Sequence, residues 1–193
     1  MLESQKQELK KHPSEYISIG ITDDGEPINS HPVPWSSSTN AYNMRIPDVY
    51  ITPDDLKDEV LMSFFETMKV IGLYIFSDLE DYSFISRFKE IFDLNIMCGH
   101  SIRNLDFLEG IKSCRMLLLT HAQLENLDVI AKEKLESESF RTFACLGLFR
   151  CRIEKIDSLI NPDIKFSELI TWNDEDQERW KDVNANTKKH FKR

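Results

Sequence analysis

Cys98 and His121 are the two residues of this sequence whose types and positions could together do covalent chemistry. Each comes directly after an apolar run of the same form, LNIM before Cys98 and LLLT before His121. If these runs stack, the imidazole could take the proton of the thiol and leave a thiolate nucleophile. Ser77 and Arg150 hold the same position in the neighbouring runs. A packed thiol beside an imidazole is the favoured interpretation, because neither an orienting third group nor an oxyanion motif accompanies the pair.

No other kind of reactive or ligand-binding site is indicated. The acidic clusters, such as Asp54-Asp55 and Asp174-Glu175-Asp176, lack the spacing of a calcium loop and are typical of helix starts and solvated surfaces. The six glycines form neither a P-loop nor a dinucleotide fingerprint. The four cysteines show no CxxC spacing, so we expect buried, reduced thiols in place of a zinc site. We therefore predict no metal, no cofactor and no enzymatic activity.

The candidate pair lies in a stretch, residues 70–160, that repeats one pattern four times. Each repeat begins with a short apolar run and continues into spaced apolar residues on a polar background. Because alternate residues of a strand point to one face, two apolar residues of each run should share a core. An insertion at residues 136–139 lengthens the last step between repeats. The aligned pairs are Leu73 and Ile75, Leu94 and Ile96, Leu117 and Leu119, and Leu146 and Leu148.

These repeats resemble the leucine-rich repeat family, whose units read LxLxxNxLxxLxxL, and in particular short bacterial internalin-like units. The third repeat matches the pattern at Leu117, Leu119, Leu124, Leu127 and Ile130, and the fourth at Leu146, Leu148, Cys151, Ile153, Ile156 and Leu159. The asparagine position holds Asp78, Gly99, Ala122 and Cys151 in the four repeats. The resemblance implies an α/β fold in which a short β-α solenoid, closed by N- and C-terminal caps, binds proteins.

The repetition has a physical reason that does not depend on the resemblance. One short strand cannot bury its apolar residues alone, whereas stacked units form a continuous core. A compact layered α/β domain with a parallel sheet is the alternative fold, since it shows the same alternation of strand and helix signals.

The residues that should point outward from the strands are unusually apolar for a solvated surface. Two rows are expected, one between the inward residues and one after them. We predict that a protein partner, or the chain's own N-terminal segment around Trp35, covers this face, because contiguous exposed apolar patches mark interaction surfaces. The predicted contact residues are Tyr74, Phe76, Asn95, Met97, Leu118, Thr120 and Phe149, with Gly147 completing the first row.

Three segments are expected along the chain. Residues 1–47 should hold a polar tail, a strand over 16–22, a tight hairpin turn at Asp23–Gly25 and an irregular segment rich in proline and serine. Residues 48–172 should hold the repeats, preceded by a strand over 48–51 and a helix from Thr52 to Lys69 that cap the stack. Residues 173–193 should be a polar C-terminal tail.

Composition narrows the function. The net charge of −9 argues against binding nucleic acid or an anionic membrane surface. No apolar run is long enough for a membrane span, and the polar N-terminus lacks a secretory signal, so a cytoplasmic protein is expected. A non-enzymatic protein-interaction module is the favoured function. The alternatives are a thiol-dependent enzyme or redox protein centred on Cys98 and His121, and a self-associating structural protein that covers its apolar face by forming a homodimer.

Overall fold

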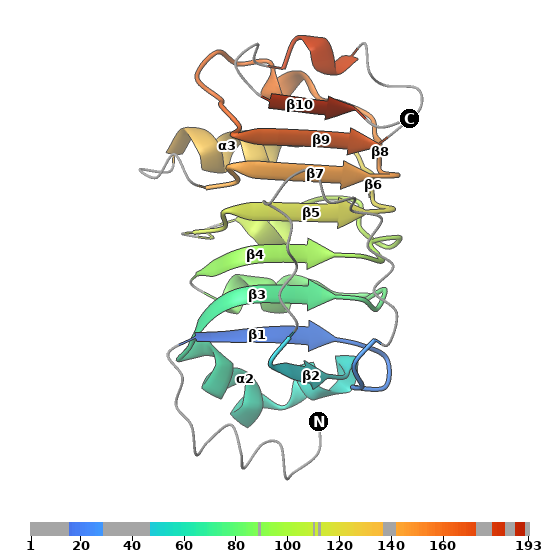
Figure 1. The fold of residues 1–193 in the computed structure, drawn as a ribbon, viewed down its shortest axis with the longest axis vertical. Helices are drawn as coiled ribbons and strands as arrows, with labels where there is room; N and C mark the ends of the chain where they lie inside the picture. Colours follow the sequence, from blue (N-terminus) through green and yellow to red (C-terminus); the bar gives the residue numbers. More distant parts are fainter. Residues whose placement is uncertain are drawn as a thin grey trace.

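The computed structural model describes residues 16–28, 47–88, 90–109, 111, 113–136, 142–172, 179–183 and 188–191, with the backbone alone for 172 and 188–191. Its central feature is an eight-stranded sheet in which every neighbouring pair is parallel (Figure 1). Across the sheet the strands are β10 Lys188–Phe191, β9 Glu168–Trp172, β7 Cys145–Phe149, β5 Met116–Thr120, β4 Ile91–Ile96, β3 Lys69–Ile75, β1 Tyr16–Ile21 and β2 Val49–Ile51. The protein is thus α/β with a parallel sheet.

From β3 onward, each strand of the sheet lies beside the strand that comes next along the chain. The exceptions are β6 Gln123–Leu124 and β8 Arg152–Ile153, which form a separate parallel pair after β5 and β7. Short helical segments connect the strands, namely η3 Ser83–Arg87, η4 Asp106–Leu108, α3 Asp128–Glu136 and η5 Asp157–Leu159, and η6 Arg179–Lys181 follows β9. Parallel neighbours need such crossovers, because a tight turn can join only antiparallel strands.

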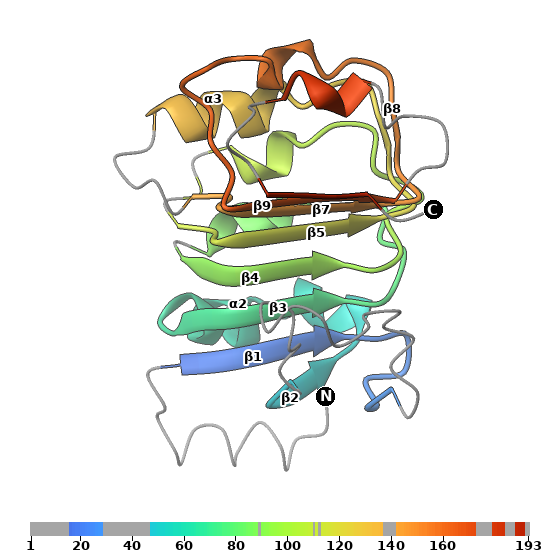
Figure 2. The ribbon, with the colours of Figure 1, turned by 45° about the horizontal axis from the view of Figure 1, so that its top comes forward.

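The core lies between the sheet and the helical segments, which cover one face of the sheet (Figure 2). The predicted inward residues are confirmed, since all eight residues of the four aligned pairs are fully buried. Helical residues pack against them, including Phe65, Ile85, Leu108, Ile130 and Leu159. Burial of a full apolar side chain contributes about 1.5–3 kcal/mol, so this interface is the main source of stability.

The N-terminal part differs from expectation in topology. The strand at β1 is confirmed, but it pairs in parallel with β2 and β3, so the predicted hairpin is wrong. The turn itself is present, because the Gly25 amide donates to Thr22 and Gly25 takes a φ of 72°. Asp-Gly can reverse the chain both in an antiparallel hairpin and before a crossover to a parallel strand, so the dipeptide alone does not indicate which strand pairs with β1.

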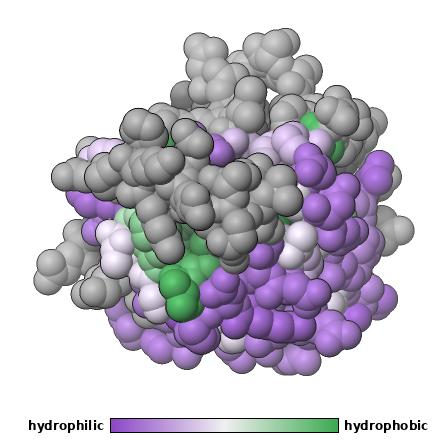
Figure 3. Space-filling model, turned by 90° about the horizontal axis from the view of Figure 1, so that it is seen from below, coloured by the Kyte–Doolittle hydropathy of each residue, from purple (hydrophilic) through white to green (hydrophobic). Residues whose placement is uncertain are grey.

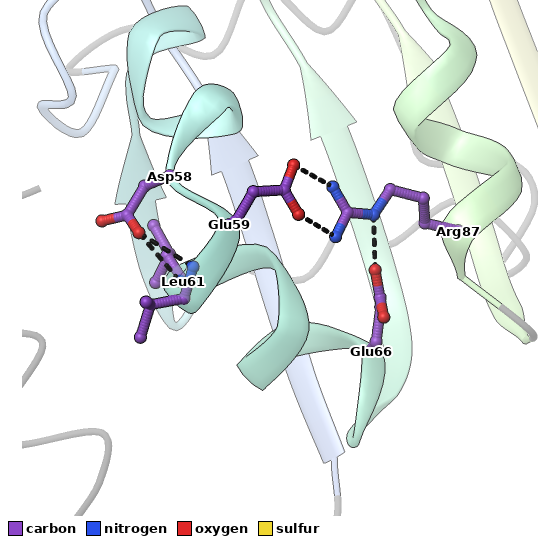
Figure 4. Close-up of polar contacts among 6 residues, drawn as sticks. Asp58, Glu59, Leu61, Glu66 and Arg87 are labelled. Carbon is purple, nitrogen blue, oxygen red and sulfur yellow. Dashed lines mark hydrogen bonds and ion pairs between the residues drawn. The ribbon is translucent and has the colours of Figure 1, made fainter.

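The predicted helix start at Thr52 is confirmed, and the helical region is shorter than expected. Thr52 and Asp55 form a reciprocal capping box at η2 Pro53–Lys57, and Asp58 then caps α2 Glu59–Glu66 by accepting from the amides of Val60 and Leu61 (Figure 4). The helix ends at Glu66, since Lys69 already begins β3. The described residues seen from this end in Figure 3 are mostly hydrophilic and include a small apolar patch.

The C-terminal residues contribute to the fold more than expected. Residues 173–193 include β10, which pairs in parallel with β9, and Trp180, which is 1% exposed. In the described parts of this segment, 179–183 and 188–191, the structure shows ordered elements where a polar tail was predicted. An edge strand is held by its backbone and tolerates a charged sequence. Among the described residues, no helix is long and apolar enough to cross a membrane.

Candidate functional site

The outward face of the sheet carries the predicted row of residues in continuous register. Direct pairing of five adjacent strands aligns one residue of each, so the expected alignment is confirmed and continues into β9. The aligned residues are Tyr74, Asn95, Leu118, Gly147 and Ile170. One row further on, Thr120 faces Phe149. The five positions from Tyr74 to Ile170 therefore lie side by side across the sheet.

Large side chains lie flat on this face over glycines. A Cβ atom added to Gly72 would lie 2.5 Å from Cε2 of Tyr74, and one added to Gly147 would lie 2.4 Å from Cδ1 of Leu118. Contacts this short do not occur, so each glycine provides the space in which its neighbour lies. Among the described glycines, the pairs of this kind are Gly20 with Tyr50, Gly72 with Tyr74, and Gly147 with Leu118.

The predicted contact residues divide into a buried group and a half-buried group. Phe76 and Met97, which follow β3 and β4, are half-buried. The helical segments lie on the other face of the sheet, and the Trp35 segment proposed as a cover lies outside the described residues. The buried residues, with their exposed fractions, are Tyr74 and Asn95 at 0%, Leu118 at 1%, Phe149 at 4% and Thr120 at 6%.

Asn95 is the one polar side chain at the centre of the aligned row. Among the residues that the structure describes, neither its amide nitrogen nor its amide oxygen has a hydrogen-bond partner. Such a group keeps the full desolvation cost of a buried amide, about 1–3 kcal/mol. Its amide has two N–H donors and one carbonyl oxygen with two lone pairs, and all of them are shielded from solvent.

Cys98 and His121 follow adjacent strands, β4 and β5, as predicted, yet they do not form an activated pair. Within the described part of the chain no hydrogen bond joins the thiol to the imidazole. Burial, and then the nearby carboxylates of Asp78 and Asp23, raise the pKa of Cys98. A thiolate nucleophile needs the opposite shift, so this environment keeps the thiol protonated at neutral pH.

The neighbour of His121 is a second histidine that was not among the predicted residues. The His100 and His121 rings stack with centroids 4.7 Å apart. Burial, and then the charges of His100 and Arg150, lower the pKa of His121. His121 and Arg150 both take left-handed φ angles, 62° and 50°. In the sequence, His100 is visible only as a second histidine two residues after Cys98. The conformation of the turns, which the sequence pattern does not specify, stacks its ring on that of His121.

The turns after the strands are closed mainly by backbone hydrogen bonds. The Gly99 amide donates to Thr120 and the Arg152 amide donates to Ala122, at 3.0 and 2.8 Å. Cys151 alone of the four predicted slot residues reaches backbone carbonyls with its side chain, at 3.4 Å from Leu119 and from Phe149. Asp78 accepts from the Ser101 amide at 3.1 Å. Hydrogen bonds of the main chain thus join neighbouring turns, the role that asparagine side chains would have in leucine-rich repeats.

The described residues contain no group of three or more histidine, cysteine or acidic side chains that could hold a metal ion. No family model, curated protein or solved structure matches the chain. The function therefore has to be argued from the outward face and its margin.

Proposed function

We propose that this chain is a non-enzymatic protein-binding module built from leucine-rich-repeat-like units, and that it contacts its partner at the margin of the outward face. The observation that carries the proposal is the pair Phe76 and Met97, which are half-buried at the end of an otherwise buried apolar surface. Half-buried apolar side chains beside a buried apolar row provide a hydrophobic contact that a partner can complete.

The repeat architecture is supported by the order of the strands and by the turns. In the main sheet, the successive strands β3, β4, β5, β7, β9 and β10 are adjacent and parallel, and hydrogen bonds join the turns of neighbouring units. Stacked units of this kind present a broad, rigid surface made from equivalent positions, which suits recognition of a protein surface. The raised pKa of the Cys98 thiol favours this function over the thiol-dependent alternative.

The buried side chain of Asn95 lies next to the same surface. It lies on β4 two residues before Met97, and its amide has no partner among the described residues. A buried amide without hydrogen-bond partners calls for an explanation, and its place beside Met97 puts it next to the proposed contact. Because Asn95 is itself 0% exposed, we infer that it lies next to the recognition surface and does not contact the partner directly.

The test is quantitative capture of partners from an extract by the intact chain and by a Phe76→Glu, Met97→Glu double variant. Ile160→Glu is the control, because Ile160 is 45% exposed after η5 and away from the outward face. We expect proteins captured by the wild type and by the control to be lost from the double variant. Equal capture by all three chains would contradict the proposed surface. Mass measurement by light scattering separates this function from self-association as a homodimer.

A further inference from the structure

Two adjoining grooves lie among the helical segments, on the side of the sheet away from Phe76 and Met97. The larger, of about 870 Å³, lies between η2 and η3, and the smaller, of about 440 Å³, lies between η3 and η4. Both are lined by Glu80, Asp81, Ser83 and Ser86, so the two grooves meet at η3. One extended ligand can therefore contact both.

The walls of the grooves offer apolar contacts. Leu56 and Phe84 line the larger groove, and Phe107 lines the smaller. Leu56 and Phe107 are half-buried. The Phe107 ring lies 5.5 Å from that of Tyr82, centroid to centroid, which holds one face of the smaller groove in place. Each groove can thus receive an apolar side chain.

The cations that line the grooves already have partners. Arg87 donates two hydrogen bonds to Glu59, at 3.0 and 2.9 Å, and a third to Glu66, which fixes η3 against α2 (Figure 4). The other cations are Lys57, which pairs with Asp54 at 2.8 Å, and Arg103, which donates to the carbonyl oxygens of His100 and Ile102. Lys57 and Arg87 are therefore neutralised by carboxylates of the chain, whereas Arg103 donates to neutral carbonyl oxygens and keeps its positive charge.

The carboxylates along the grooves are not balanced in this way. Asp78, Glu80, Asp81 and Asp106 line them, and within the described residues none of the four forms an ion pair. The pKa of Asp81 is lowered by hydrogen bonds from Ser83, which keeps this carboxylate ionised. Among the described residues, these four carboxylates outnumber the one cation of the grooves that has no carboxylate partner, Arg103, so the grooves carry net negative charge. Net negative charge beside apolar walls complements a ligand that carries positive charge and apolar groups.

We propose that these grooves bind an extended basic segment of a partner protein, in which Lys or Arg side chains approach Glu80 and Asp106 and an apolar side chain enters each groove. This surface is separate from the one proposed above, so either can fail without the other. The net charge of −9 would increase the encounter rate with such a segment.

Selection of random octapeptides on the immobilised full chain tests the proposal. We expect the selected peptides to be rich in Lys or Arg together with aromatic or aliphatic residues. The Glu80→Gln, Asp106→Asn variant should bind them about three- to tenfold more weakly, as expected for the loss of two exposed ion pairs. The Asp157→Asn, Asp163→Asn variant removes the same charge near η5 and should bind them as the wild type does.

Two further measurements test the electrostatic character and the location of the binding. The affinity for the selected peptides should fall as the salt concentration rises from 0.05 to 0.5 M, because solvent-exposed charges are screened. The amide resonances of Ser86 and Phe107 should shift on titration with a selected peptide. The proposal is overturned by failure to enrich basic peptides, by equal binding to both charge variants, or by shifts confined to other elements.

Discussion

The imidazole rings of His100 and His121 stack with their centroids 4.7 Å apart and their planes inclined by 25°. The two rings come from turns that follow adjacent strands, and Arg150 follows the next strand. Protonation of His121 therefore places a positive charge near Arg150, which is positively charged, and near His100, which can become so. Its lowered pKa follows first from burial and then from these neighbours.

Stability should fall in acid because of His121. Its pKa lies below 6.5 in the folded chain, so the unfolded chain binds the proton at higher pH and the free energy of unfolding decreases as the pH falls below 6.5. His121→Asn should reduce this dependence, and Asn tolerates the left-handed φ of 62°. NMR titration of the imidazole measures the pKa. A value above 6.5 would contradict the expected environment.

The Cys98 thiol should react slowly with alkylating reagents at neutral pH. Burial and the charges of Asp78 and Asp23 raise its pKa, so little thiolate is present. Asp78→Asn should accelerate alkylation, since it removes one of the two carboxylates. The rate of iodoacetamide labelling as a function of pH measures both effects. A thiol that titrates below its ordinary range would instead support the thiol-dependent enzyme.

Replacement of Asn95 should separate stability from binding. Asn95→Leu removes an amide without hydrogen-bond partners among the described residues and should raise the free energy of unfolding by about 1–2 kcal/mol. Chemical denaturation measures this change. The same variant should capture as much partner as the wild type, because Asn95 is fully buried and does not contact the partner. A loss of stability would show that the amide has partners in solution.

Gly72→Ala should destabilise the fold because its Cβ would lie 2.5 Å from the Tyr74 ring. Overpacking of this kind costs about 1–3 kcal/mol. The matched comparison is Gly72→Ala in a chain that already carries Tyr74→Leu, in which the space is free. A double-mutant cycle from urea denaturation gives the coupling between the two positions. Additive effects would mean that the ring does not lie over the glycine.

The chain should gain stability between about pH 8 and 10.5 because of Lys134. Burial lowers the pKa of Lys134 to about 8 from 10.5, although its ammonium donates to the carbonyl oxygens of Thr142 and Phe143. In this interval the unfolded chain holds a proton that the folded chain has released, so the free energy of unfolding rises with pH. Lys134→Met should flatten this rise. Identical pH profiles for the two chains would argue for an exposed amine.

Local patterns in the sequence were sufficient to predict the elements that depend on near neighbours. The alternation that places Leu117 and Leu119 inward follows from the period of a strand, and Thr52 begins a helix through its own hydroxyl. The position of β1 between β2 and β3 could not be predicted in this way, because strand order depends on contacts between segments far apart in the chain.

The candidate site could also be predicted only as far as it depends on local patterns. Alignment of Tyr74 with Asn95 follows from the repeat, whereas their burial depends on what lies over the sheet. The stacking of His100 on His121 depends on turn conformations that the repeat pattern does not specify. Charge suggested that the last residues were solvated, but β10 is held through its main chain.

The sheet ends on two very short strands, and this limits how molecules can aggregate. β2 has three residues and β10 has four, whereas β3 between them has seven. A free edge can recruit another chain in proportion to the number of unpaired main-chain groups that it offers. β2 pairs with β1 only at Ile19, Gly20 and Ile21, so the described edge at this end is short and interrupted. Short edges of this kind reduce the number of main-chain groups through which a second molecule could add a strand.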